Sequence, residues 1–534
     1  MARAKKFLSG LGTSYLLISF NTLWTLVSLP VALHYLAPSD YSLWLFVATV
    51  AGYLSMIDLG TSGAGIRLLV DYKDAPAQGA YGGIIKSMWA LSTMQAALIL
   101  IVGLAGTGAL VSFFELAGEQ AAAFRRLWVW QVIFLALNFV FRIGNQILQA
   151  HQRMDFSNYA LAGSFLLNLV LLVAGLHAGL GLDSFILGQG VSLVVMLAAM
   201  SVACARLGLL PARGAWGAFS RAQVRRVFGF GTEFFLITIG TLLTTGSQIL
   251  LLKKMLPTEA AFVAVLVWSV MTKLFTLGTQ LASRLVMTAG PALSEMVVRG
   301  EMDRLWRRYR TMVELSLLVS AYLGLLIALG NNAFVKIWTP QRITWPEWNN
   351  GLLALWFLLL IQSSGHTSLL FHFKQVGRLK AVYLAEGVLF VLLACVVIPW
   401  GGITGMLACS IVSTSLLSVS YLNRRIAKLA GLPVRVVLLE WSRPAARFLV
   451  LVAPPALALA WWTRDSAWLR LLGCALPAAL AGAWVMLRFC LPGELRSEMQ
   501  ARLPARWPWA ATILGHGQKK FHPAPARAPD GRGE

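Results

Sequence analysis

The chain has 534 residues, of which 58% are hydrophobic and 13% are charged, and its formal net charge is +23. Soluble domains carry about 25% charged residues, so this composition excludes an ordinary water-soluble protein. The positive charge fits loops that face an anionic lipid bilayer, and no nucleic-acid partner is predicted because no basic domain interleaved with aromatic residues is present.

Apolar stretches of the roughly 20 residues needed to cross a bilayer recur along the whole chain. The first eight are residues 11–36, 41–60, 88–114, 127–150, 159–179, 184–205, 228–252 and 260–287. The next six are residues 312–334, 352–373, 382–400, 403–422, 448–462 and 468–491. The sequence therefore predicts an all-α integral membrane protein with about fourteen transmembrane helices.

The loops between these stretches differ in charge from one side to the other. Lys and Arg are about four times more frequent in loops on the side of the N-terminus, which places both termini in the cytoplasm. Long basic loops follow spans six, eight and twelve, which suggests two six-helix lobes and an added pair. The predicted parts are an N-lobe at 1–206, a basic cytoplasmic linker at 207–227, a C-lobe at 228–425, a C-terminal helix pair at 426–491 and a disordered cytoplasmic tail at 492–534. The basic segment 297–310 is predicted to lie on the inner leaflet as an amphipathic helix.

Several cationic side chains fall inside the predicted spans. A charge in the bilayer costs at least about 2.5–3.5 kcal/mol, so such residues usually face protein or a wet cavity. A cationic cavity would suit a phosphate or diphosphate group. The predicted substrate-binding residues are Arg142, Lys253, Lys254, Lys273 and Arg284.

All of these residues except Lys273 also have a simpler interpretation. Arg142 could pair with an acidic neighbour inside the membrane. Lys253 and Lys254 could merely flank the end of span seven. Arg284, like Glu314 and Glu386, lies near a predicted cytoplasmic end, where long side chains snorkel to the interface.

Polar groups that could couple or gate transport lie at the ends of two spans. Span two closes on Asp58, and a run of small residues leads from there to Arg67. Small residues permit close packing or a local break, so this segment is either an inner gate or a packed helix end. Glu233 and Gln248 bracket span seven and complete the predicted coupling or gating set.

Motifs for catalysis, metals or nucleotides are lacking in the sequence. No outer loop is large enough to carry paired catalytic carboxylates, and no glycine-rich phosphate loop joins a strand to a helix. The five cysteines form no metal or disulfide pattern. We therefore expect no enzymatic activity and no cofactor.

Four segments stand out as motifs along the chain. The first covers residues 15–60 and closes on Ile-Asp-Leu-Gly. The second is Arg142-Ile-Gly-Asn-Gln-Ile-Leu-Gln-Ala-His-Gln-Arg153. The other two are Gly290-Pro-Ala-Leu-Ser-Glu295 and Phe334-Val-Lys-Ile-Trp-Thr-Pro340. In their order along spans one to twelve, these segments resemble bacterial polysaccharide flippases of the multidrug/oligosaccharidyl-lipid/polysaccharide exporter superfamily, whereas the last two spans match no motif.

The resemblance implies two lobes around a central cavity that opens alternately to each side of the bacterial inner membrane. The implied substrate is an undecaprenyl-diphosphate-linked oligosaccharide, with a proton or sodium ion as the coupling ion and polysaccharide polymerase machinery as a partner. Gln248 stands where some relatives carry an acid, which leaves Asp58 and Glu233 as coupling candidates.

Three rival functions stay open. A lipid II flippase fits fourteen spans and a cationic cavity. A drug/cation antiporter would favour an acidic cavity instead. A membrane polysaccharide polymerase would need a large catalytic outer loop.

Overall fold

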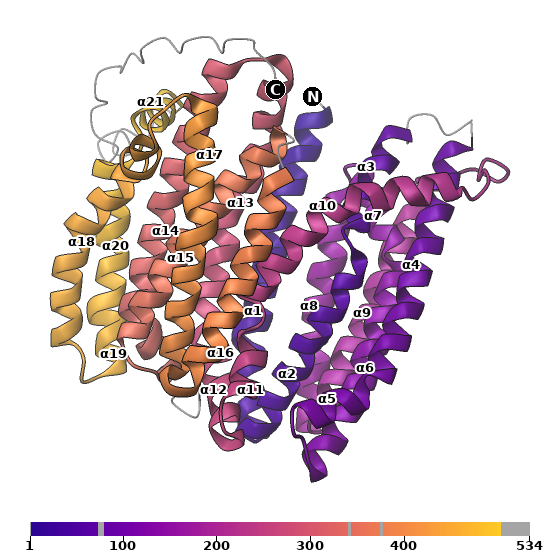
Figure 1. Ribbon diagram of the computed structural model, residues 1–534, viewed down its shortest axis with the longest axis horizontal. Helices are drawn as coiled ribbons and strands as arrows, with labels where there is room; N and C mark the ends of the chain where they lie inside the picture. Colours follow the sequence, from indigo (N-terminus) through magenta and orange to yellow (C-terminus); the bar gives the residue numbers. More distant parts are fainter. Residues whose placement is uncertain (1, 73–78, 340–342, 374–376, 503–534) are drawn as a thin grey trace. The chain divides into compact units, whose positions relative to one another are not determined.

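The computed structural model describes residues 2–72, 79–339, 343–373 and 377–502, and within these ranges it is helical without strands (Figure 1). This confirms the predicted all-α class. Twelve helices of the described residues are long and apolar enough to span a membrane, or thirteen if one bent pair counts as a single span. One of them, Gly377–Ala430, contains two predicted spans, which separate at Gly402 with φ 53° and ψ −140°. The predicted number of fourteen and the orientation remain predictions.

The chain forms two compact units that separate between Ser269 and Val270. The predicted linker at residues 207–227 lies within unit 1, and the division into two six-helix lobes stays a prediction. Unit 1 contains α1 (Ala2–Tyr35), α2 (Pro38–Leu54), η1 (Ser55–Asp58), α3 (Thr61–Tyr72), α4 (Ala80–Ala105), α5 (Thr107–Phe113), α6 (Gly118–Phe141), α7 (Ile143–Ala150), α8 (Met154–His177), α9 (Asp183–Arg206), α10 (Arg221–Thr245), α11 (Gln248–Met255) and most of α12 (Thr258–Met271).

The basic linker is held against unit 1. Tyr81 donates a hydrogen bond to the backbone oxygen of Leu209 over 3.0 Å, and Lys86 donates to that of Gly217 over 2.8 Å. The backbone of Trp216 lies so close to α4 that a Cβ on Gly82 would clash with it. Glycines at the start of α4 therefore let the linker pack directly on the helix backbone.

Unit 2 is built around the 37-residue helix α14. The C-terminal helices α18 and α20 lie side by side against it (Figure 1). Arg470 fastens them, since its Nε donates to Leu329 O over 2.8 Å and its Nη1 to Ala460 O over 2.6 Å. The helices of unit 2 are α13 (Lys273–Arg299), α14 (Met302–Trp338), α15 (Trp348–His372), α16 (Gly377–Thr414), η3 (Ser415–Val419), α17 (Ser420–Ala430), η4 (Val436–Glu440), α18 (Arg443–Trp462), α19 (Ala467–Leu469), η5 (Arg470–Ala475), α20 (Leu476–Val485), η6 (Met486–Cys490) and α21 (Gly493–Arg502).

The basic segment 297–310 does not form a separate surface helix. Its residues from Met302 onward are the first turns of α14, which at 1.5 Å per residue is about 55 Å long and exceeds a bilayer core of about 30 Å. Residues 493–502 of the predicted disordered tail form α21. Its Glu498 pairs with Arg308, and Thr311 donates to its Glu494 over 3.2 Å. Residues 503–534 lie outside the described residues.

The predicted orientation can be tested by cysteine labelling. With the five native cysteines replaced by Ala, we expect Arg304→Cys to react with a membrane-impermeant maleimide only after the membrane has been permeabilised. Trp348→Cys, 65% exposed at the other end of α14–α15, should react in intact cells. The reverse pattern would place the N-terminus outside.

Candidate functional site

A polar network lies where the second span ends. Helix α2 stops at Leu54, the turn η1 follows, and Leu59 and Gly60 have positive φ angles of 50° and 73°. For leucine this conformation costs about 1–2 kcal/mol, so packing must hold it. Asp58 Oδ1 in this turn lies 2.6 Å from Nη1 of Arg142, which caps the end of α6.

Gln95 of α4 and Thr61 of α3 complete the network. Arg142 Nη2 donates to Gln95 Oε1 over 2.8 Å, and Gln95 Nε2 donates to the Ile57 backbone oxygen over 2.8 Å. The Thr61 hydroxyl donates to Asp58 Oδ1 over 3.0 Å. Four helical elements thus converge on one ion pair, with side chains only 12% exposed for Arg142 and 25% for Asp58.

In this geometry the charge of Arg142 is compensated by Asp58, so Arg142 is not a free cation. An ion pair with additional hydrogen bonds is how charges are tolerated inside a membrane. The structure therefore shows the alternative in which Arg142 pairs with an acidic neighbour. Asp58 lies at the break between α2 and α3 and pairs with Arg142. Its role in gating stays a prediction.

The two lysines of span seven lie in unit 1 and contact its side chains. Lys253 is only 6% exposed, and its Nζ lies 3.8 Å from the ring centroid of Phe262. Lys254 Nζ lies 3.0 Å from Glu115 Oε1 and donates to the backbone oxygen of Phe113 over 2.8 Å. These contacts offset both charges, and the predicted role of the lysines in substrate binding stays a prediction.

The remaining gating candidates are placed less fully. Gln248 begins α11 after a bend of 49°, is buried, and donates to the Thr244 backbone oxygen over 2.5 Å. Its side chain therefore satisfies a backbone oxygen at the break in span seven. Glu233 lies in α10 and Arg67 in α3, but their side chains are outside the described part of the structure.

Helix α13 of unit 2 carries a polar stripe opposite its buried face. Phe275 and Ala282 face the core, where they pack with Phe357. Residues spaced i, i+3, i+7 and i+11 share the other face, because a helix has 3.6 residues per turn. These residues are Lys273, Thr276, Gln280 and Arg284.

Two cations of this stripe lie about 16 Å apart along the axis, at 1.5 Å per residue. Lys273 is half-buried and, within the described residues, makes no hydrogen bond or ion pair. It follows a break in span eight, where Asn331 Nδ2 donates to the freed Met271 oxygen over 2.9 Å. The α13 stripe therefore places an uncompensated cation inside a span, as the substrate-site prediction requires.

Unit 2 also contains a buried polar cluster that we did not predict. Glu386 is 2% exposed and accepts a 2.8 Å hydrogen bond from Thr414, while its Oε2 has no partner among the described residues. Tyr309 and His366 contact each other at 2.6 Å. The expectation that Glu386 snorkels to the interface is wrong, because its side chain is buried within unit 2 and bonded to Thr414.

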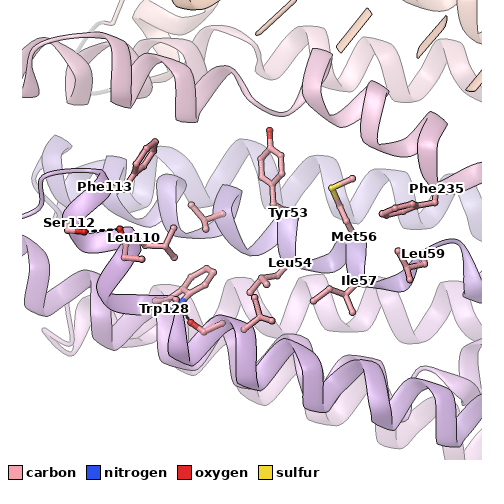
Figure 2. Close-up of a pocket in the computed structure, with 15 residues that line it drawn as sticks. Tyr53, Leu54, Met56, Ile57, Leu59, Leu110, Ser112, Phe113, Trp128 and Phe235 are labelled. Carbon is pink, nitrogen blue, oxygen red and sulfur yellow. Dashed lines mark hydrogen bonds between the residues drawn. The ribbon is translucent and has the colours of Figure 1, made fainter. Parts of the chain in front are cut away.

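An apolar cavity of about 830 Å³ lies within unit 1 beside the Asp58–Arg142 pair. Figure 2 shows its labelled side chains extending from Phe113 at one end to Leu59 and Phe235 at the other. Its volume is within the range of about 300–1,000 Å³ that is usual for ligand pockets. Among the described residues, no group of three or more His, Cys, Asp or Glu side chains could hold a metal ion.

Solved structures of membrane transporters share this fold. An inward-facing multidrug resistance MATE family transporter of the MOP superfamily aligns with a TM-score of 0.60 and 16% identity, over 77% of this chain and 95% of that one. The lipid II flippase MurJ in an inward closed conformation aligns with a TM-score of 0.64 and 9% identity, over 91% and 99%. An outward-facing MATE family transporter gives 0.61 and 14%, over 80% and 96%.

The chain thus has the fold of MOP superfamily transporters, as the sequence resemblance predicted. No family model matches the chain, and no curated protein matches it by sequence. The similar structures are MATE family transporters and a lipid II flippase.

Proposed function

We propose that this chain, which has the fold of MOP superfamily transporters, is a flippase for an undecaprenyl-diphosphate-linked oligosaccharide. It moves this substrate from the inner to the outer leaflet of the bacterial inner membrane by alternating access. Its product would supply polysaccharide polymerase machinery. The substrate is a large amphiphile with a strongly anionic linkage, so the protein must hold a diphosphate inside the bilayer.

The observation that carries the proposal is the α13 stripe. Lys273 makes no ion pair within the described residues and lies with Arg284 on one face of a helix. A buried cation without a counter-ion is costly, and binding of an anionic group would offset that cost. A cationic drug would gain nothing there, so the stripe disfavours a drug/cation antiporter.

A lipid II flippase is the second candidate, and one observation favours it. The similarity to MurJ covers 91% of this chain, against 77–80% for the two MATE family transporters. Both candidates carry a diphosphate-linked glycan on a polyprenyl tail. They differ in their sugars. Because the α13 stripe would bind the diphosphate that both substrates share, it does not distinguish the two candidates.

A proton or sodium ion is the proposed coupling ion. Asp58 is already paired with Arg142, whereas Glu386 has one carboxylate oxygen without a partner in the described structure. Glu386 therefore joins Asp58 and Glu233 as a coupling candidate. A carboxylate enclosed by helices can gain or lose a cation only when the packing opens, which would link ion binding to conformation.

The test is deletion of the gene followed by lipid and surface analysis. We expect loss of a surface polysaccharide and accumulation of its polyprenyl-diphosphate-linked unit on the inner leaflet. Plasmid-borne wild-type protein should reverse both effects. Growth arrest with lipid II accumulation would support the second candidate, and a normal surface with altered drug sensitivity would contradict both flippase functions.

A further inference from the structure

The apolar cavity of unit 1, here called the slot, lies between two broken helices. On one side α2 gives way to η1 and Leu59. On the other, α4 ends at Ala105 and α5 begins at Thr107, and Gly106 between them lines the slot. Broken backbone at membrane depth is tolerated where protein covers it or a cavity lies beside it. Trp128 supplies part of this cover, since its Nε1 donates to Gly103 O over 2.8 Å.

The chemistry of the slot selects an uncharged occupant. Its lining contains no charged residue, and its polar side chains are few. The charges at its two ends are already paired. Lys254 pairs with Glu115 beside Phe113, and Asp58, next to Leu59 in the chain, pairs with Arg142. A phosphate would find no charged side chain in this lining, whereas a hydrocarbon loses nothing on entry.

The slot is continuous with an exposed apolar surface of α4 and α5. Along α4 the apolar side chains of Leu98, Ile101 and Val102 are 46%, 66% and 48% exposed. Val102 also lines the slot, as does Phe113 of α5, which is 55% exposed. Exposed apolar residues of a membrane span contact lipid tails, so a tail can enter the slot sideways past Val102.

We propose that the slot receives the polyprenyl tail of the carried lipid during translocation, an inference that rests on the proposed function. Entry brings no hydrophobic gain, because lipid tails are as apolar as the lining. The gain comes from dispersion contacts that depend on fit. The slot therefore distinguishes tails by length and branching.

Binding by purified protein in nanodiscs tests this inference with two probes, undecaprenyl diphosphate and the short geranyl diphosphate. We expect wild-type protein to bind the long probe at least about tenfold more tightly, which corresponds to about 1.4 kcal/mol. Val102→Trp should fill the slot and remove that difference, with binding of the short probe unchanged. Ile101→Trp is the matched control, since Ile101 is the preceding residue, is exposed, and does not line the slot.

The outcomes separate the two proposals. If wild-type protein binds neither probe, the flippase function fails. If Val102→Trp keeps the full dependence on tail length, the slot is not the tail site, although the flippase function stands. Native mass spectrometry adds a third outcome. Loss of a co-purified phospholipid from Val102→Trp, with undecaprenyl diphosphate binding intact, would identify the occupant as a membrane lipid and overturn the inference.

Discussion

Replacing Arg142 by Ala should destabilise the protein by about 3–5 kcal/mol, because a largely buried carboxylate would lose its partner. Asp58 would keep its hydrogen bond from Thr61 but not the cation 2.6 Å away. Asp58→Asn should cost a similar amount, since Asn can still accept that hydrogen bond but the buried cation of Arg142 loses its carboxylate. The double variant Asp58→Asn/Arg142→Gln should unfold at a higher temperature than Arg142→Ala, because no charge is left unpaired. Thermal unfolding in detergent measures each effect.

Transport by the double variant then decides between structure and gating. If the pair only holds α2 to α6, export should return together with stability. If the pair opens and closes during the cycle, a stable double variant should still transport poorly. The exposed Arg126–Asp183 pair, 2.9 Å apart, is the control, and its neutralisation should cost no more than about 1 kcal/mol. Wild-type stability in Arg142→Ala would contradict the ion pair.

Hydropathy was sufficient to predict an all-helical membrane protein, and sequence motifs were sufficient to predict the fold. A helix that crosses a bilayer needs a long apolar run, and that requirement is local in sequence. The contact between Asp58 and Arg142 is not local. Both were singled out as charges in membrane spans, but their pairing depends on α2 packing against α6.

The prediction for Glu386 failed because the sequence does not distinguish a side chain that reaches the lipid interface from one that is buried in protein. Lipid and protein interior look alike in hydropathy, so the sequence cannot tell which face of a span is buried. Glu386 was therefore assigned to the interface, although helices surround it. One available signal was the spacing of Ser410, Ser413 and Thr414, which puts three hydroxyls on one face of the neighbouring span and predicts a buried polar partner.

Lys273→Ala should weaken diphosphate binding without lowering stability, whereas Arg142→Ala should lower stability. Lys273 makes no hydrogen bond or ion pair with any described residue, so removing its charge breaks no such contact. Removal relieves part of the insertion cost of about 2.5–3.5 kcal/mol, and stability should stay the same or rise. A hydrogen bond to a charged group contributes about 1.5–3 kcal/mol. Diphosphate binding should therefore weaken by about 10- to 100-fold.

Binding of undecaprenyl diphosphate and thermal unfolding, measured on the same preparation, test this combination. Lys273→Arg should retain most of the binding, because the charge is kept at the same position on α13. Lys86→Ala is the control for loss of a helix lysine, since Lys86 is outside the predicted substrate-binding set and donates to the backbone oxygen of Gly217 over 2.8 Å. Lower stability in Lys273→Ala would show a structural role instead. Unchanged binding would remove Lys273 from the substrate site, and the diphosphate would then have to be held elsewhere.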